Sequence, residues 1–234
     1  MGRAAAVLIL LTALAAYAAF FPRLPALSNW GDVAFLAFLA IPATFALVWL
    51  ALPLVEAPAR VLAAGALTLA LIAALLDAAE LEIPANFAKL AAATAFGWWF
   101  LAFFEAVWWV VLVALLIIPV DLFSVARGPT REITENRPQV FDALSVFFRL
   151  PGEDLTAQIG LTDVLFFGLF LGATVRFGLR TAPTWVAMAL SFGATVALAV
   201  ALEQAGVAAL PLLSAAFVLV NADLLVRSFT RRSA

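Results

Sequence analysis

The strongest constraint on the fold is a succession of long apolar runs separated by short polar segments. Of the 234 residues, 66% are hydrophobic and 12% are charged, and the mean hydropathy is +1.12. A helix crosses a hydrocarbon core about 30 Å thick with roughly 20 predominantly apolar residues. Runs near that length recur at residues 4–21, 33–55, 60–76, 85–104, 106–126, 160–176 (or as far as 180), 183–203 and 207–227. The sequence therefore predicts an all-α fold, a polytopic transmembrane bundle of eight or nine helices.

We expect residues 1–234 to form a single integral membrane domain. Its parts are N-terminal helices in 1–104, a helix pair in 105–180 joined by the long polar loop 127–159, and C-terminal helices in 181–234. The first run also has features of a signal peptide, because Arg3 precedes it and an Ala-x-Ala pattern occupies residues 16–18. About 18 apolar residues are long enough to span a membrane, so we expect a retained helix.

The composition excludes several kinds of chemistry. The chain has no cysteine and no histidine, so it has no disulfide, no thiol nucleophile, no Ser-His dyad or triad and no zinc site of the His-x-x-x-His type. We expect neither a metal nor another cofactor. A net charge of −2 gives no reason to expect nucleic-acid binding. Carboxylates and a single lysine, Lys89, are left for acid–base chemistry.

Two aspartates lie in apolar sequence on either side of the polar loop. Asp121 belongs to the run that precedes the loop and Asp163 to the run that follows it. An ionisable residue in a membrane helix costs about 2.5–3.5 kcal/mol on insertion scales, which makes it a functional-site hypothesis. At 1.5 Å per residue, Asp121 lies roughly 7 Å inside the membrane and Asp163 roughly 5 Å, on the same side. Neighbouring helices would therefore bring the two carboxylates together.

Two carboxylates that lie close together can share one proton near neutral pH. The ionised member can take a proton from water as the water attacks a peptide carbonyl, and the protonated member can polarise that carbonyl. Each aspartate also has a purely structural interpretation. Asp163 starts a helix, where a carboxylate is favoured by free N–H groups, and Asp121 can reach toward the headgroups near a helix end.

Two other polar features have an interpretation from sequence. Residues 140–148, VFDALSVFF, form either a short amphipathic or gating element or an ordinary solvated loop. Lys89 lies near the start of its run, so we expect its amine to extend to the headgroups.

The residues around Asp121 resemble the first motif of the presenilin and signal-peptide-peptidase family of intramembrane aspartyl proteases. That motif is Tyr-Asp, and the presenilins continue with Gly-Pro-x-Arg and a Glu four residues beyond the Arg. The corresponding segments here are Val120-Asp121-Leu122, Gly128-Pro129-Thr130-Arg131 and Glu135.

The second and third motifs of the family have counterparts in the same order. Gly-x-Gly-Asp corresponds to Gly160-Leu161-Thr162-Asp163, and Pro-Ala-Leu, followed by Pro in presenilins, corresponds to Ala208-Ala209-Leu210-Pro211. Asn221-Ala222-Asp223-Leu224 resembles the polar break late in the last presenilin helix. The resemblance covers residues 100–229. Three positions depart from it: Val120 stands for tyrosine, Thr162 for glycine and Ala208 for proline.

The resemblance implies an intramembrane aspartyl protease, with nine helices in the family against eight counted here. The Ala-rich composition is compatible with a prokaryotic genome, so we expect the protein in a prokaryotic plasma membrane. Its substrates would be single-pass transmembrane helices or signal peptides within the lipid bilayer. Asp121 and Asp163 would be catalytic. The substrate would contact the two other motif segments, at Gly160, Leu161, Thr162, Ala208, Ala209, Leu210 and Pro211.

Other functional classes remain open. A proton-coupled transporter also uses carboxylates in membrane helices, although no inverted repeat is evident. A protease-like protein that binds helices without cutting them is compatible with the three departures. Prepilin peptidases share the Gly-x-Gly-Asp pattern but offer no counterpart to the Gly-Pro-x-Arg and Leu-Pro segments. A Ser124–Lys89 hydrolase is a weaker alternative.

Overall fold

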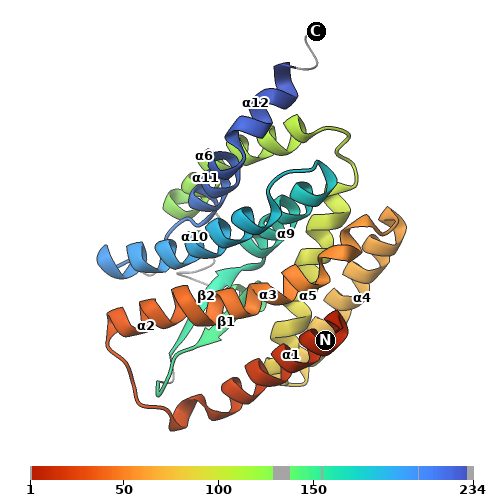
Figure 1. Ribbon diagram of the computed structural model, residues 1–234. Helices are drawn as coiled ribbons and strands as arrows, with labels where there is room; N and C mark the ends of the chain where they lie inside the picture. The colour runs from red at the N-terminus through yellow and green to blue at the C-terminus, as the bar shows by residue number, and fades with distance from the viewer. Residues whose placement is uncertain (1, 129–137, 154, 205, 231–234) are drawn as a thin grey trace.

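A computed structural model describes residues 2–128, 138–153, 155–204 and 206–230, most of which are helical (Figure 1). In the N-terminal half the helices are α1 (Arg3–Phe20), α2 (Asn29–Phe35), α3 (Ile41–Ala51), α4 (Ala59–Ala78), α5 (Glu82–Leu101) and α6 (Val107–Arg127). The C-terminal half contains α8 (Pro138–Ala143), β1 (Ser145–Arg149), β2 (Thr156–Gly160), α9 (Leu161–Arg176), α10 (Thr181–Ala201), α11 (Leu210–Val220) and α12 (Ala222–Thr230). Each of the eight predicted ranges contains helix.

Prolines explain the irregular turns of the second run. Between α2 and α3 the backbone makes a π-helical turn, η2 (Leu36–Ala40), and Pro42 follows at the start of α3. Proline cannot donate the helical hydrogen bond to the carbonyl four residues earlier, and π turns absorb such interruptions. Pro53 lies in a 3₁₀ turn, η3 (Leu52–Glu56), that ends the run. The chain therefore stays helical over residues 29–56 despite both prolines.

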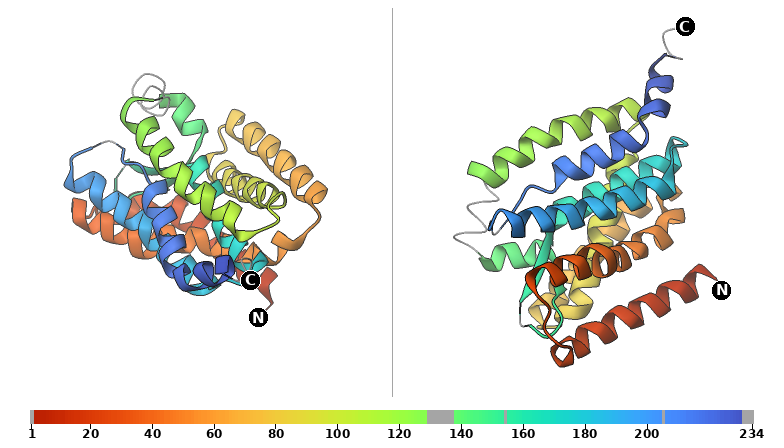
Figure 2. Two further views of the ribbon diagram at one scale, coloured as in Figure 1. Left: turned by 90° about the horizontal axis from the view of Figure 1, so that it is seen from above. Right: turned by 60° about the vertical axis from the view of Figure 1, so that its left-hand side comes forward.

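Helix α9, which carries Asp163, is the centre of the bundle. Residues 166–174 of this helix are all buried, and Phe167 and Phe170 are fully enclosed. Their rings pack on Phe45 of α3 and Phe217 of α11, with centroid distances of 4.3 and 4.8 Å. A helix that is apolar on all sides belongs inside a protein. By contrast, α1 has no buried residue, and α1 and α6 lie on opposite outer sides of the bundle (Figure 2).

Helices α5 and α9 cross at a point where a side chain would not fit. A Cβ added at Gly97 would overlap the backbone carbonyl oxygen of Leu165 and lie 3.0 Å from the backbone nitrogen of Leu169. One turn away, the indole Nε1 of Trp98 donates a hydrogen bond to the carbonyl of Gly168 over 3.0 Å. Small residues let membrane helices approach closely. This contact fixes the position of α9 against α5.

Five helical segments in the described part of the chain are long and apolar enough to cross a membrane: Arg3–Arg23, Asn29–Glu56, Ala59–Ala78, Val107–Arg127 and Thr181–Ala201. A sixth is added if α11 and α12, which meet at 69°, form one broken span. Helix α9 has 16 residues, about 24 Å at 1.5 Å per residue, and is surrounded by other helices. The described part of the chain is therefore mostly helical, with five or six segments that are able to cross a membrane, and the count of eight crossings stays a prediction.

The break between α11 and α12 is held by hydrogen bonds from the start of α10. The guanidinium of Arg180 donates to both carboxylate oxygens of Asp223, over 2.6 and 2.9 Å. The buried amide of Asn221 accepts from the Arg180 backbone N–H and donates to Thr184. The polar segment that resembles the family's late break is thus where the last helix bends.

Candidate active site

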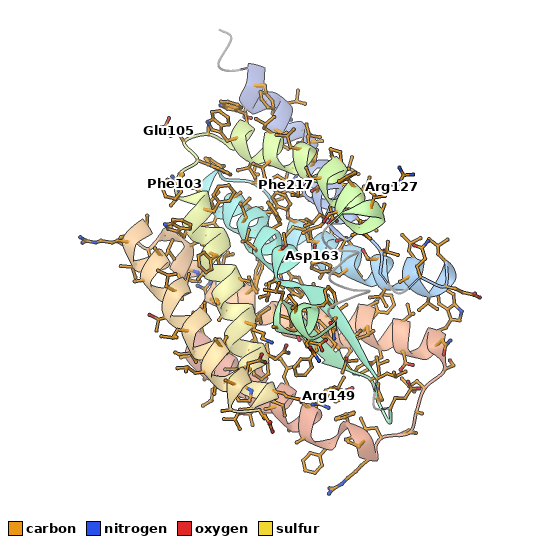
Figure 3. The ribbon with its side chains drawn as sticks, turned by 180° about the vertical axis from the view of Figure 1, so that it is seen from behind. Phe103, Glu105, Arg127, Arg149, Asp163 and Phe217 are labelled. Atoms are coloured by element: carbon orange, nitrogen blue, oxygen red, sulfur yellow. The ribbon has the colours of Figure 1, made fainter. Side chains whose placement is uncertain are left out.

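Asp163 lies in the first turn of α9, directly after strand β2. Gly160 ends the strand with extended backbone, φ −60° and ψ 145°, and α9 begins at the next residue. The carboxylate turns back toward this junction, where it interacts with the backbone N–H of Gly160. A helix start offers unpaired N–H groups that favour a carboxylate. Figure 3 shows Asp163 in the interior, between the strands and the outer helices.

Asp121 lies in α6, six residues before the helix ends at Arg127. Its Oδ2 accepts a hydrogen bond from the backbone N–H of Leu210 over 3.1 Å. Leu210 is the first residue of α11, and its N–H is one of the donors that a helix start leaves without an internal partner. The bond joins the first predicted catalytic residue to the predicted substrate-binding segment 208–211.

The two aspartates come together from separate helices. The carboxylate of Asp121 is close enough to that of Asp163 to interact with it electrostatically. Neither side chain is fully exposed, and Phe167 and Leu210 beside them are buried. In such partly buried surroundings, an electrostatic interaction between two carboxylates is stronger than it is in water.

The predicted substrate-contact residues divide into two groups. Gly160 contacts Asp163 through its backbone N–H, and Leu210 donates its backbone N–H to Asp121. Ala208, Ala209 and Pro211 adjoin Leu210 in the chain. Leu161 and Thr162 line a cavity of about 530 Å³ between α4, α5 and the start of α9. Thr162 is exposed there. The first group therefore lies at the aspartate pair, whereas Leu161 and Thr162 also line the neighbouring cavity.

A β-hairpin precedes α9 in the polar loop, where the sequence left open an amphipathic element or a solvated loop. Strands β1 and β2 pair antiparallel, with Ser145 opposite Gly160 and Arg149 opposite Thr156. Ser145, Val146 and Phe148 are buried and Phe147 is less so, and the strands are joined through Pro151 and Gly152. Alternation of polar and apolar residues beside a Pro-Gly turn is a hairpin signal in a sequence. The alternation in TAQIG and the Pro-Gly pair could therefore have indicated a hairpin, whereas SVFFR shows no alternation of its own.

Lys89 is buried, contrary to the expectation that its amine extends to the headgroups. The residue is 7% exposed, and its Nζ donates to Asp77 Oδ1 over 3.0 Å and to the backbone carbonyl of Asp142 over 3.1 Å. Asp142 Oδ1 in turn accepts from Gln158 of β2. A partner on α4 and another on α8 hold the amine inside. Lys89 thus ties the hairpin to the bundle, which argues against a role as the base of a Ser-Lys hydrolase.

Replacing Lys89 with methionine is expected to destabilise the protein by about 1–2 kcal/mol, since a charged hydrogen-bond donor is lost between helices. Thermal unfolding in detergent measures the change. Asp77→Asn and the double variant complete a cycle, in which a coupling of at least about 0.5 kcal/mol is expected. Strictly additive effects would mean that the ion pair contributes nothing.

In the described residues, no group of three or more Asp or Glu side chains is arranged to hold a metal ion. Comparisons of the chain with protein-family models, with curated proteins and with solved structures found no match. Function is therefore inferred from the sequence motifs and from the geometry of the aspartate pair.

Proposed function

We propose that the protein is an intramembrane aspartyl protease with a presenilin-like bundle of about eight helices, in a prokaryotic plasma membrane. Its substrates are single-pass transmembrane helices or signal peptides. One observation carries the proposal: Asp121 and Asp163, from helices on either side of a long loop, interact with each other while Asp121 binds the start of α11. These are the three segments whose sequences resemble the family motifs.

In this proposal the aspartate pair holds a single proton and activates water. The ionised carboxylate accepts a proton from the water as its oxygen attacks the peptide carbonyl, and the other carboxyl donates a hydrogen bond to the carbonyl oxygen. Proton return to the leaving nitrogen then breaks the C–N bond. The hydrogen bond from Leu210 occupies one oxygen of Asp121 and so helps to fix the direction of that carboxylate.

The open edge of the strand beside Asp163 is a second argument for a peptide substrate. In the described part of the chain, the outward backbone groups of Thr156 and Gln158 on β2 have no hydrogen-bond partner, and the outward N–H of Gly160 faces Asp163. An open strand edge binds an extended peptide through main-chain hydrogen bonds. A helix in lipid keeps its own backbone bonded, so the substrate must unwind before cleavage. The edge of β2 offers partners to such an unwound segment.

The first experiment is cleavage of a synthetic single-pass helical substrate in proteoliposomes, with fragments identified by mass spectrometry. We expect two fragments from one internal peptide bond, and inhibition by a hydroxyl-bearing mimic of the tetrahedral intermediate. Binding of such helices without fragments, across several substrates, would favour the non-cleaving alternative. Proton movement into the vesicles with no cleavage would favour the transporter.

A further inference from the structure

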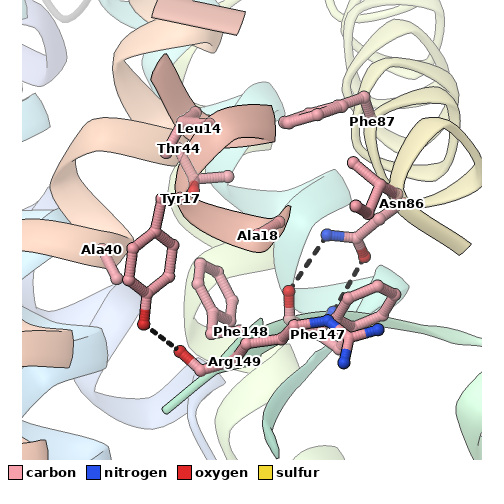
Figure 4. Close-up of a pocket in the computed structure, with 11 residues that line it drawn as sticks. Leu14, Tyr17, Ala18, Ala40, Thr44, Asn86, Phe87, Phe147, Phe148 and Arg149 are labelled. Carbon is pink, nitrogen blue, oxygen red and sulfur yellow. Dashed lines mark hydrogen bonds between the residues drawn. The ribbon is translucent and has the colours of Figure 1, made fainter. Parts of the chain in front are cut away.

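The outer edge of β1 is closed by a side chain of α5. In the register of the hairpin, Val146 and Phe148 pair with β2, so the backbone N–H and C=O of Phe147 point outward. Asn86 binds both of them: the Phe147 N–H donates to Asn86 Oδ1 over 2.9 Å, and Asn86 Nδ2 donates to the Phe147 carbonyl over 3.0 Å. Figure 4 shows the two bonds side by side. The carboxamide thus takes the place of a peptide group on a neighbouring strand.

A second side chain covers the same edge two residues further on. The hydroxyl of Tyr17 on α1 donates to the backbone carbonyl of Arg149 over 2.7 Å (Figure 4). The Tyr17 ring packs against Phe35 of α2, with centroids 5.3 Å apart. Successive outward positions of β1 are therefore bound by helices α5 and α1.

The two edges of the hairpin thus differ sharply. On β1 both outward backbone groups of Phe147 and the backbone carbonyl of Arg149 are bound by side chains, whereas the outward groups of Thr156 and Gln158 on β2 have no partner in the described residues. An unblocked edge is a template for a further strand, and a bound one is not. Of the two strands, β2 is the one that Asp163 follows in the chain, three residues after Gly160.

We propose that Asn86 is a positioning residue that decides which edge of the hairpin receives the substrate, by closing β1 at Phe147 and leaving β2 open. This inference rests on the proposed proteolytic function. Asn86 does not touch the aspartate pair; it acts through β1. Loss of its carboxamide frees two backbone groups on the wrong edge, where a bound peptide is separated from Asp163 by both strands.

Disulfide mapping tests the inference independently of cleavage. The chain has no cysteine, so each introduced thiol is unique. The probe is a synthetic Leu/Ala-rich transmembrane peptide with lysines at both ends and one cysteine, moved in turn through its central positions. Thr156→Cys reports pairing with β2 and Phe147→Cys reports pairing with β1, because opposed residues on paired strands have Cβ atoms about 4.5–5.5 Å apart.

With Asn86 intact, we expect the peptide to crosslink at position 156 and not at 147. Asn86→Leu keeps the approximate size of the side chain but makes neither hydrogen bond. Crosslinking at position 147 should then rise roughly tenfold, because the two backbone groups of Phe147 become free to bind the peptide; tenfold corresponds to about 1.4 kcal/mol. Asn29→Leu, the same change at an exposed site on α2, should leave the pattern unaltered.

The inference is overturned if Asn86→Leu gives the same pattern as the unaltered chain, if position 147 already reacts with Asn86 intact, or if neither position reacts. Each of these results can occur with an active protease, so they are distinct from failure of the proposed function. Should Asn86→Leu not fold, Asn86→Asp serves instead. It keeps an acceptor for the Phe147 N–H but leaves the carbonyl without a donor, so position 147 should again become reactive.

Discussion

Replacing either Asp121 or Asp163 with asparagine is expected to lower the rate of substrate cleavage by ~10²–10⁴-fold, the range that one general acid or base contributes. An amide cannot take a proton from water, and it cannot hold the proton that the pair shares. The measurement is the rate of fragment formation in proteoliposomes under single-turnover conditions, with the same amount of each variant inserted.

The asparagine substitutions are chosen because they leave the observed contacts in place. The amide at position 121 would still offer an oxygen to the Leu210 N–H, and the amide at position 163 would still offer one to Gly160. The fold should therefore persist, and the lower cleavage rate should come from the missing acid–base group. Because the two residues act as a unit, the double variant should be no slower than the slower single variant.

A matched control removes a carboxylate beside the start of α6, the end of that helix far from Asp121. Glu105 is exposed in the turn before α6, away from Asp163 (Figure 3). Glu105→Gln should change the rate by less than about twofold, since it alters only surface charge. Substantial cleavage by either aspartate variant would rule out the shared-proton mechanism.

The positions of the helices follow from the sequence because a membrane helix depends mainly on its own apolar length. Pro42 did not end the second run, since a π turn absorbed the interruption, and Pro53 lies in the 3₁₀ turn with which the run ends. The approach of Asp121 and Asp163 was also predictable, because one loop returns the chain from the same side and fixes both depths. No knowledge of the other helices is needed for that prediction.

The sequence did not predict features that depend on contacts between distant segments. Lys89 is buried because Asp77 and the Asp142 carbonyl meet it from two other elements, and nothing near Lys89 in the sequence indicates those partners. The hairpin was left undecided because two five-residue strands lie among the charges of a long polar segment. Likewise, the bond between Asp121 and the Leu210 N–H joins residues 89 positions apart.

The contact between α5 and α9 should be as important for activity as for stability. Gly97→Ala places a methyl group against the carbonyl oxygen of Leu165, two residues after Asp163, and backbone cannot move aside as a flexible side chain can. We expect a loss of about 1–3 kcal/mol in the free energy of unfolding, typical of overpacking. A displacement of about 1 Å at a catalytic group can cost ~10²-fold, so cleavage should fall by up to that factor.

Gly65→Ala is the matched control, because it makes the same change inside helix α4 where a Cβ would meet no atom within 4 Å. It should leave cleavage unchanged and stabilise the protein by up to about 1 kcal/mol, since alanine favours a helix over glycine. Thermal unfolding and cleavage are measured on both variants in the same lipid. If Gly97→Ala lowers stability but not cleavage, α9 can shift on α5 without moving Asp163, and the aspartate is not rigidly placed by this contact. If stability and cleavage fall together in Gly97→Ala while Gly65→Ala lowers neither, the α5–α9 contact is what holds Asp163 beside Asp121.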